Sequence, residues 1–223
     1  IAATGKPVAV VLLNGRPLVL EKENVDADAL LEAWYPGTMG ADAVTDILFG
    51  QYNPSGKLTM TFPRSVGQVP IFYYEKNTGR PIYLPSDKYK SKYLDSPNDP
   101  LYPFGYGLSY TTFEFGKPKY NNKTGKLTVT IANTGKMDGD EVVQVYLKKV
   151  GDIDGPNKTL RAYKRVTLKA GEKQTVEIDL PRESFEWWDA ATNTMRVMNG
   201  EFEVMIGNSS DDACLKKIIV KSL

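Results

Sequence analysis

Four short stretches in the second half of the chain alternate apolar and polar residues with a period of two. They are 127–131, 143–147, 176–180 and 202–206, and runs rich in Gly, Asn and Asp separate them. A period of two places every second side chain on one face of a β-strand. Several such strands with regular turn signals predict a β-sandwich. Because a single cysteine excludes the paired cysteines of antibody domains, we expect a fibronectin type III-like sandwich over residues 111–223.

The first half of the chain has a different pattern. Residues 8–13 are continuously apolar, which is typical of a strand buried on both faces in the middle of an α/β sheet. A central strand needs neighbours on both sides, and the first half offers few. We therefore expect this segment to be the end of an α/β sandwich domain that begins upstream of Ile1. An edge strand at a natural start is the alternative.

Local signals divide this first half further. Asn14-Gly15 between residues 8–13 and 18–20 predicts a hairpin, and residues 29–34 are compatible with either a helix or a strand. Residues 38–50 predict a helix capped by Thr38 and stopped by Gly50. Residues 58–62 predict a strand. We expect the α/β part to cover residues 1–75 and an irregular connector to cover residues 76–110.

Composition excludes several kinds of chemistry. The chain has 223 residues, no histidine and one cysteine, so Ser-His-Asp catalysis, His-based metal sites and internal disulfides are impossible within it. We expect Cys214 to be a small core residue. The net charge of +1 gives no basic field for nucleic acid, and no apolar run approaches the ~18 residues of a membrane span. No metal and no cofactor are expected.

Several ordered motifs give the chain a family resemblance. In sequence order they are Asn14-Gly15-Arg16-Pro17-Leu18, Glu32-Ala33-Trp34-Tyr35-Pro36-Gly37, Ile47-Leu48-Phe49-Gly50, Asn53-Pro54-Ser55-Gly56-Lys57-Leu58, Phe62-Pro63-Arg64-Ser65 and Tyr102-Pro103-Phe104-Gly105-Tyr106-Gly107-Leu108-Ser109-Tyr110-Thr111-Thr112-Phe113. Together they resemble glycoside hydrolase family 3. The resemblance is dense over residues 5–115 and weaker in the sandwich. Val66-Gly67-Gln68-Val69-Pro70 and Asn77-Thr78-Gly79-Arg80-Pro81 are most similar to bacterial periplasmic members.

The resemblance implies a retaining, exo-acting β-glucosidase that removes terminal non-reducing β-D-glucosyl residues from oligosaccharides. Such enzymes use two carboxyl groups. The resemblance places the Asp nucleophile in an N-terminal barrel and the Glu acid/base on the α/β domain, both upstream of Ile1. The chain alone should then be inactive, and its partners would be the substrate, the missing barrel and the upstream α/β elements, with a homo-oligomer also open. A periplasmic or secreted location is implied.

Carboxylates within the chain are the alternative source of catalytic groups. Residues 21–28 are expected to form a solvated charged loop, and Asp42 and Asp46 a solvated helix face. Glu32 lies among apolar residues and could be buried, but no family motif gives it a role. Glu177 and Asp179 should point outward from their strand.

Sugar contacts are predicted in the connector. Polar and aromatic residues that suit sugar binding by stacking and hydrogen bonding gather there, namely Arg80, Tyr83, Tyr89, Tyr93 and Asp95. Of these we take Arg80, Tyr89 and Tyr93 as candidate substrate-binding residues; the alternative is a tether packed on the sandwich. Trp187 and Trp188 should provide one core ring and one loop ring. A non-catalytic carbohydrate- or protein-binding sandwich is the alternative function.

Overall fold

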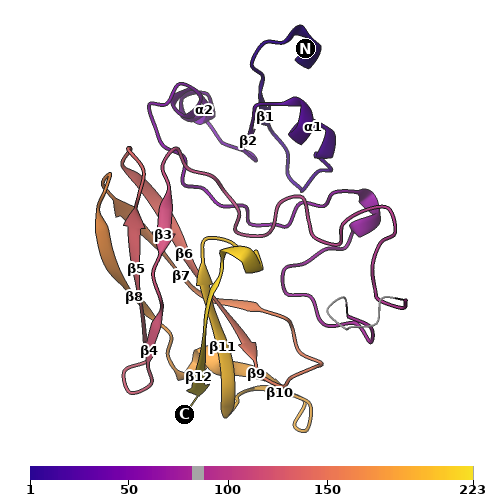
Figure 1. Ribbon diagram of the computed structural model, residues 1–223, viewed down its shortest axis with the longest axis vertical. Helices are drawn as coiled ribbons and strands as arrows, with labels where there is room; N and C mark the ends of the chain where they lie inside the picture. Colours follow the sequence, from indigo (N-terminus) through magenta and orange to yellow (C-terminus); the bar gives the residue numbers. More distant parts are fainter. Residues whose placement is uncertain (82–87, 223) are drawn as a thin grey trace.

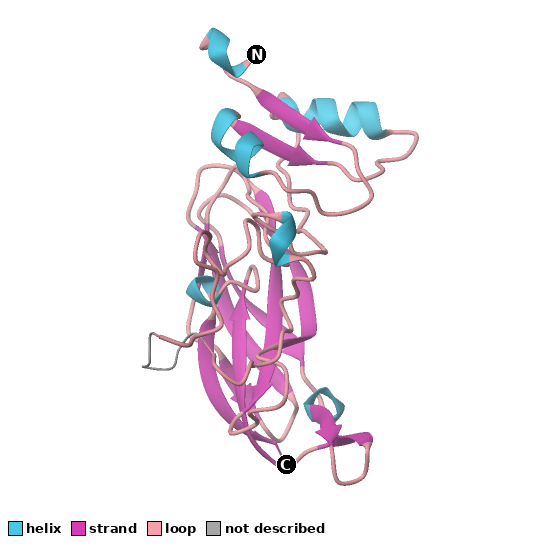
Figure 2. Ribbon diagram, turned by 90° about the vertical axis from the view of Figure 1, so that its right-hand side faces the viewer, coloured by secondary structure: helices cyan, strands magenta, loops and turns pink. Residues whose placement is uncertain are grey.

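The computed structural model describes residues 1–81 and 88–222 and has two parts (Figures 1 and 2). A small α/β part lies at the end that carries the N-terminus, and an elongated antiparallel β-sandwich extends from it toward the C-terminus. The α/β part is parallel and the sandwich is antiparallel, as the two sequence patterns predict. No helix among the described residues is long and apolar enough to cross a membrane.

The α/β part is built on two parallel strands. β1 (Ala9–Leu12) pairs with β2 (Ala29–Glu32), and α1 (Glu21–Asp26) connects them. The predicted hairpin over residues 14–20 is therefore wrong, and so is the charged loop over 21–28, most of which is α1. Pro17 cannot donate a ladder hydrogen bond, which weakens a hairpin partner, whereas β2 offers a full apolar strand. β1 pairs with β2 alone within the described residues and is half-buried.

The helix predicted over residues 38–50 is confirmed as α2 (Gly40–Leu48). Gly50, with φ +73°, ends it as expected, but Met39 and not Thr38 occupies the N-cap position, with no side-chain cap hydrogen bond. The strand predicted over residues 58–62 is reduced to an isolated bridge between Phe62 and Tyr102. A strand ladder does not form because the connector crosses this segment with only scattered backbone bonds.

The sandwich consists of two antiparallel sheets. Their strands are β3 (Phe113–Phe115), β4 (Lys119–Asn121), β5 (Lys126–Asn133), β6 (Gly139–Lys149), β7 (Thr159–Leu168), β8 (Lys173–Asp179), β11 (Gly200–Gly207) and β12 (Lys216–Ser222). One sheet has the order β12-β11-β6-β7; in the other, β5 pairs with β3, β4 and β8. β9 (Glu186–Asp189) and β10 (Thr194–Val197) form a separate two-stranded antiparallel sheet. All four predicted strands are present.

The inner faces of these sheets form the main hydrophobic core. Alternate residues of β5, β6, β8 and β11 point inward, and the largest fully buried side chains of this core are Leu127, Ile131, Leu147, Leu168, Leu180, Phe185, Phe202 and Ile206. Trp187 is also in this core, as predicted, whereas Trp188 is about half exposed but lies on β9 and not in the predicted loop. Cys214 is exposed, so the prediction that it is a core residue is wrong. It lies in a single 3-10 turn, Asp212–Cys214, outside the sheets.

The connector, together with Tyr73 just before it, covers part of the outer face of the β12-β11-β6-β7 sheet. Tyr146 and Met205 point outward from this sheet, yet both are fully buried, because Tyr73 and Phe104 pack over them. The rings of Tyr73 and Phe104 stack with centroids 4.3 Å apart. Burial raises the pKa of the Tyr146 hydroxyl, which donates a hydrogen bond to Gln144. The sheet thus buries apolar side chains on part of its outer face as well, and the connector is part of the fold.

Candidate functional site

The structure brings two of the three predicted sugar-binding residues together. The Arg80 guanidinium carbon lies 5.3 Å from the centre of the Tyr89 ring, and the Ser91 amide donates to the Arg80 carbonyl. The Lys88 ammonium lies 5.5 Å from the same ring. Tyr89 remains 58% exposed, so its ring is open to contact. Tyr83 lies outside the described residues.

Tyr93 occupies a separate position in the connector. Its hydroxyl donates to the Gly67 carbonyl at 3.0 Å, and its amide donates to Asn98. Within residues 1–81 and 88–222, no hydrogen bond or ring contact joins Tyr93 to Arg80 or Tyr89. Asp95 is exposed. The predicted trio is therefore a pair plus one tyrosine whose hydroxyl is engaged in local structure.

The carboxylates do not form a catalytic pair in the described part of the chain. Asp42 and Asp46 are exposed on α2, as predicted. Glu177 and Asp179 point outward from β8, also as predicted, and both contact the Lys126 ammonium. A glycosidase needs two carboxyl groups that face one bond of the substrate, whereas Glu177 and Asp179 are both engaged with one surface lysine.

Glu32 lies at the carboxyl end of β2 and has an unusual environment. Its Oε1 atom accepts a hydrogen bond from the Trp34 amide at 2.8 Å. Its Oε2 atom is buried, and no donor from the described residues reaches it. Trp34 itself has φ +50°, a left-handed conformation that is an outlier for a bulky residue. Nothing in the sequence signals this backbone conformation.

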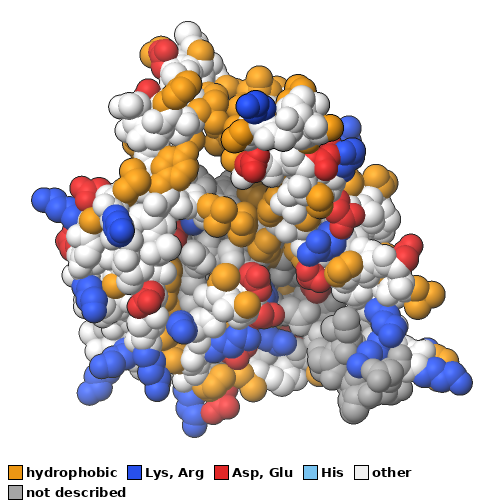
Figure 3. Space-filling model, turned by 45° about the horizontal axis from the view of Figure 1, so that its top comes forward, with side chains coloured by type: hydrophobic (Ala, Val, Ile, Leu, Met, Phe, Trp, Pro, Cys, Tyr) orange, Lys and Arg blue, Asp and Glu red, His pale blue; other side chains and the backbone are white. Residues whose placement is uncertain are grey.

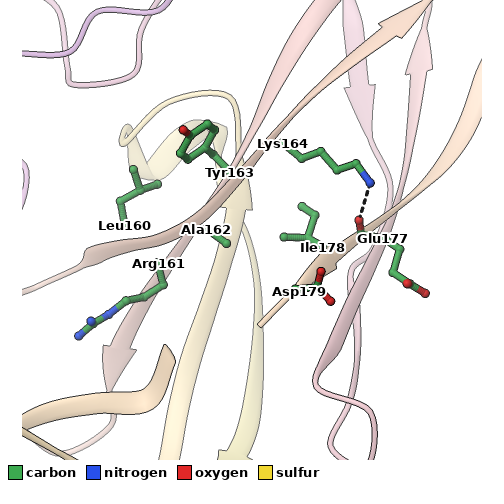
Figure 4. Close-up of a pocket in the computed structure, with 8 residues that line it drawn as sticks. All are labelled: Leu160, Arg161, Ala162, Tyr163, Lys164, Glu177, Ile178 and Asp179. Atoms are coloured by element: carbon green, nitrogen blue, oxygen red, sulfur yellow. Dashed lines mark hydrogen bonds between the residues drawn. The ribbon is translucent and has the colours of Figure 1, made fainter. Parts of the chain in front are cut away.

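A shallow hollow of about 550 Å³ opens along the side of the sandwich between β7 and β8 (Figure 4). Its lining side chains diverge: Tyr163 and Arg161 point in different directions, and Lys164 donates to the Glu177 carbonyl at 2.9 Å. Burial lowers the pKa of the Arg161 guanidinium, which lies 5.6 Å from the Trp187 ring and donates to the Glu186 carbonyl. These groups support the sandwich edge and do not converge on a substrate.

The described residues include no group of three or more His, Cys, Asp or Glu side chains that could hold a metal ion. This includes four aspartates that lie close together in the sequence, namely Asp138, Asp140, Asp152 and Asp154. Asp140 pairs with Arg165, and Asp152 accepts from the Trp187 indole. The loops at the end of the sandwich are thus held together by protein hydrogen bonds.

Comparison with known proteins accounts for nearly the whole chain. Residues 1–110 match the Glycosyl hydrolase family 3 C-terminal domain, and residues 141–210 match the Fibronectin type III-like domain. The chain is 48% identical to a periplasmic beta-glucosidase of Salmonella typhimurium over 93% of its length. It is 42% identical to a xylan 1,4-beta-xylosidase of Xylanibacter ruminicola over 98% of its length.

Solved structures give the same correspondence. A beta-glucosidase from Listeria innocua in complex with glucose superimposes with a TM-score of 0.89 and 41% identity over 99% of this chain. The chain spans 31% of that structure, 28% of the Salmonella relative and 24% of the Xylanibacter relative. It therefore corresponds to less than a third of the length of each of these relatives.

Proposed function

The chain carries the C-terminal domain of glycoside hydrolase family 3 joined to a fibronectin type III-like domain, and we propose that it is the C-terminal third of an exo-acting β-glucosidase. The observation that carries this proposal is the match of both domains, in order and over 99% of the chain, to a beta-glucosidase structure. The proposed substrate is an oligosaccharide with a terminal non-reducing β-D-glucosyl residue. A periplasmic location belongs to the same proposal and is supported by the name of the Salmonella relative.

In this proposal both catalytic carboxyl groups belong to the part of the enzyme outside this chain. Retaining hydrolysis needs an acid and a nucleophile about 5–5.5 Å apart. Glu177 and Asp179 on the sandwich are paired with a lysine, and Glu32 accepts from the backbone. What this chain contributes to the proposed enzyme is the β1–β2 part of the α/β domain and the sandwich that supports it.

The test compares the chain with the full-length polypeptide. With aryl β-D-glucoside and aryl β-D-xyloside as substrates, the full-length enzyme should hydrolyse the glucoside with the higher kcat/KM, and the chain alone should hydrolyse neither. A preference for the xyloside would replace the glucosidase proposal with a xylosidase, which the Xylanibacter relative makes the second candidate. Turnover by the isolated chain that is lost on Glu32→Gln would place the catalytic acid within it.

We also propose that Arg80, Tyr89 and Tyr93 contact the substrate. The Tyr89 ring is exposed beside two cations, which gives a stacking surface flanked by hydrogen-bond donors. In the full-length enzyme, Tyr89→Ala should raise KM for a trisaccharide more than for an aryl glucoside. Tyr163→Ala, on another exposed tyrosine, in the sandwich, is the control. Equal KM values for Tyr89→Ala and wild type would favour a connector that only tethers the domains.

A non-catalytic binding sandwich is the competing proposal. It predicts retention of the chain on immobilised β-glucan without any hydrolytic activity in the full-length polypeptide. The α/β motifs over residues 14–58 argue against it, because a binding sandwich alone has no need of them.

A further inference from the structure

Trp34 lies in a strained backbone conformation at the carboxyl edge of the β1–β2 pair. Its φ of +50° is costly for a residue with a large side chain, and such strain persists only where the surroundings enforce it. The Glu32 carboxylate does so by accepting the Trp34 amide at 2.8 Å. The Trp34 ring is anchored against the buried Phe62 ring, with centroids 5.8 Å apart. Strain of this kind concentrates at ligand-binding and active sites.

The effect of this turn is to present the next residue, Tyr35, at the surface. Tyr35 is 80% exposed, yet one edge of its ring lies against Gly15, where a Cβ atom would come within 2.8 Å of the ring. The loop after β1 and the loop after β2 thus fix the ring between them. An exposed aromatic ring is usually mobile, and this one is held.

The position of Tyr35 in the sheet also favours a ligand contact. Parallel sheets bind ligands at the carboxyl ends of their strands, and Gly15 and Tyr35 follow the carboxyl ends of β1 and β2. Apolar side chains gather on the face of the molecule that carries this α/β part (Figure 3). The buried acceptors Asn14 Oδ1 and Glu32 Oε2 at the same edge have no donor among the described residues.

We propose that Tyr35 stacks on the leaving-group sugar of the substrate, and that Glu32 is a positioning residue that sets its orientation through Trp34. The inference rests on the proposed glycosidase function. The terminal glucosyl residue needs polar partners around its hydroxyls. A single exposed aromatic ring suits instead the sugar of the leaving group, which can stack on it. Tyr35 thereby strengthens the binding of disaccharides and not that of substrates that lack a second sugar ring.

The test uses the full-length enzyme and two substrates that share the glucosyl group. Cellobiose has a sugar leaving group, and β-D-glucosyl fluoride has none. Tyr35→Ala should lower kcat/KM for cellobiose roughly five- to tenfold, mainly through KM, and leave that for the fluoride unchanged. Tyr35→Phe keeps the ring and should restore the cellobiose value. Tyr163→Ala, on an exposed tyrosine of β7, should change neither.

Glu32 is tested by a pair of variants. Glu32→Ala removes the acceptor for the Trp34 amide and should reproduce the cellobiose-specific loss, while Glu32→Gln keeps an acceptor oxygen and should retain most of the wild-type value. Equal losses on both substrates together with a lower Tm, or no loss on either, would overturn the inference while leaving the glycosidase proposal intact. Wild-type enzyme inactive on both substrates would overturn the glycosidase proposal and this inference with it.

Discussion

At the scale of single residues, one buried ion pair joins the two parts of the chain. The Lys57 ammonium lies 2.8 Å from Glu141 Oε1, and the two side chains are only 10% and 3% exposed. Lys57 comes from a motif of the α/β part and also donates to the Gly107 carbonyl, while Asn208 donates to the second Glu141 oxygen. A carboxylate this deeply buried depends on its cation, because burial of an unpaired charge is costly.

Lys57→Met should therefore destabilise the chain by about 3–5 kcal/mol, because Glu141 would remain buried without its cation. Urea unfolding followed by circular dichroism gives the free-energy change. Lys126→Met is the matched control: Lys126 pairs with Glu177 and Asp179 at the surface, where water screens the charges, and its loss should leave stability nearly unchanged. In Lys57→Met/Glu141→Leu the stranded charge is absent, so stability should recover in part. Similar losses for both single lysine variants would contradict this account.

At the scale of elements, the prediction from sequence succeeded where one pattern decides the structure. The alternation of β5, β6, β8 and β11 predicts each strand because one face of each packs into the main core. Alternation could not predict that Tyr146 on the opposite face is also buried, since its cover comes from Tyr73, just before the connector, and from Phe104 within it. The hairpin at Asn14-Gly15 failed for a related reason: a distant strand, β2, competes better for β1 than the adjacent residues do.

The candidate site was predictable only in part. The polar and aromatic composition of the connector predicts Arg80, Tyr89 and Tyr93 as sugar-binding residues. The structure places Arg80 and Tyr89 in contact, while the Tyr93 hydroxyl donates to the Gly67 carbonyl. The strained backbone at Trp34 gave no sequence signal, because large side chains rarely take a positive φ. Such a conformation depends on the Glu32 contact and on the packing of the ring, which are properties of the folded chain.

Gly50 provides a prediction at the same scale, because it ends α2 with φ +73°. No atom lies within 4 Å of a Cβ built at this position, so a side chain would not clash and only the backbone conformation opposes it. Gly50→Ala should cost about 1 kcal/mol of unfolding free energy in urea denaturation. Gly79→Ala, where there is equal space and no left-handed backbone, should cost close to nothing. An equal effect at both positions would mean that the helix end does not require the left-handed conformation.

At the scale of the whole molecule, the sandwich carries the main core and the rest of the chain closes over it. Most of the fully buried large side chains belong to the sandwich, whereas the α/β part exposes many of its apolar residues. The connector runs from one part to the other, and Phe104 within it and Tyr73 just before it cover Tyr146 and Met205 on the outer face of the β12-β11-β6-β7 sheet. The sandwich should consequently fold without the α/β part but depend on the connector for full stability.

Residues 111–223 expressed alone should unfold cooperatively, because the inner core between the two sheets is complete within them. They should nevertheless be less stable than the whole chain by several kcal/mol, since Tyr146 and Met205 lose their cover and each buried apolar side chain stabilises a fold by about 1.5–3 kcal/mol. The free energies of unfolding in urea measure this difference. A fragment of residues 53–223 keeps Tyr73, Phe104 and the Lys57–Glu141 ion pair and should recover most of it, while Phe104→Ala in that fragment should lose part again. If residues 111–223 matched the whole chain in stability, the connector would be a passive tether. If they showed no cooperative transition, the inner core would be insufficient to fold the sandwich.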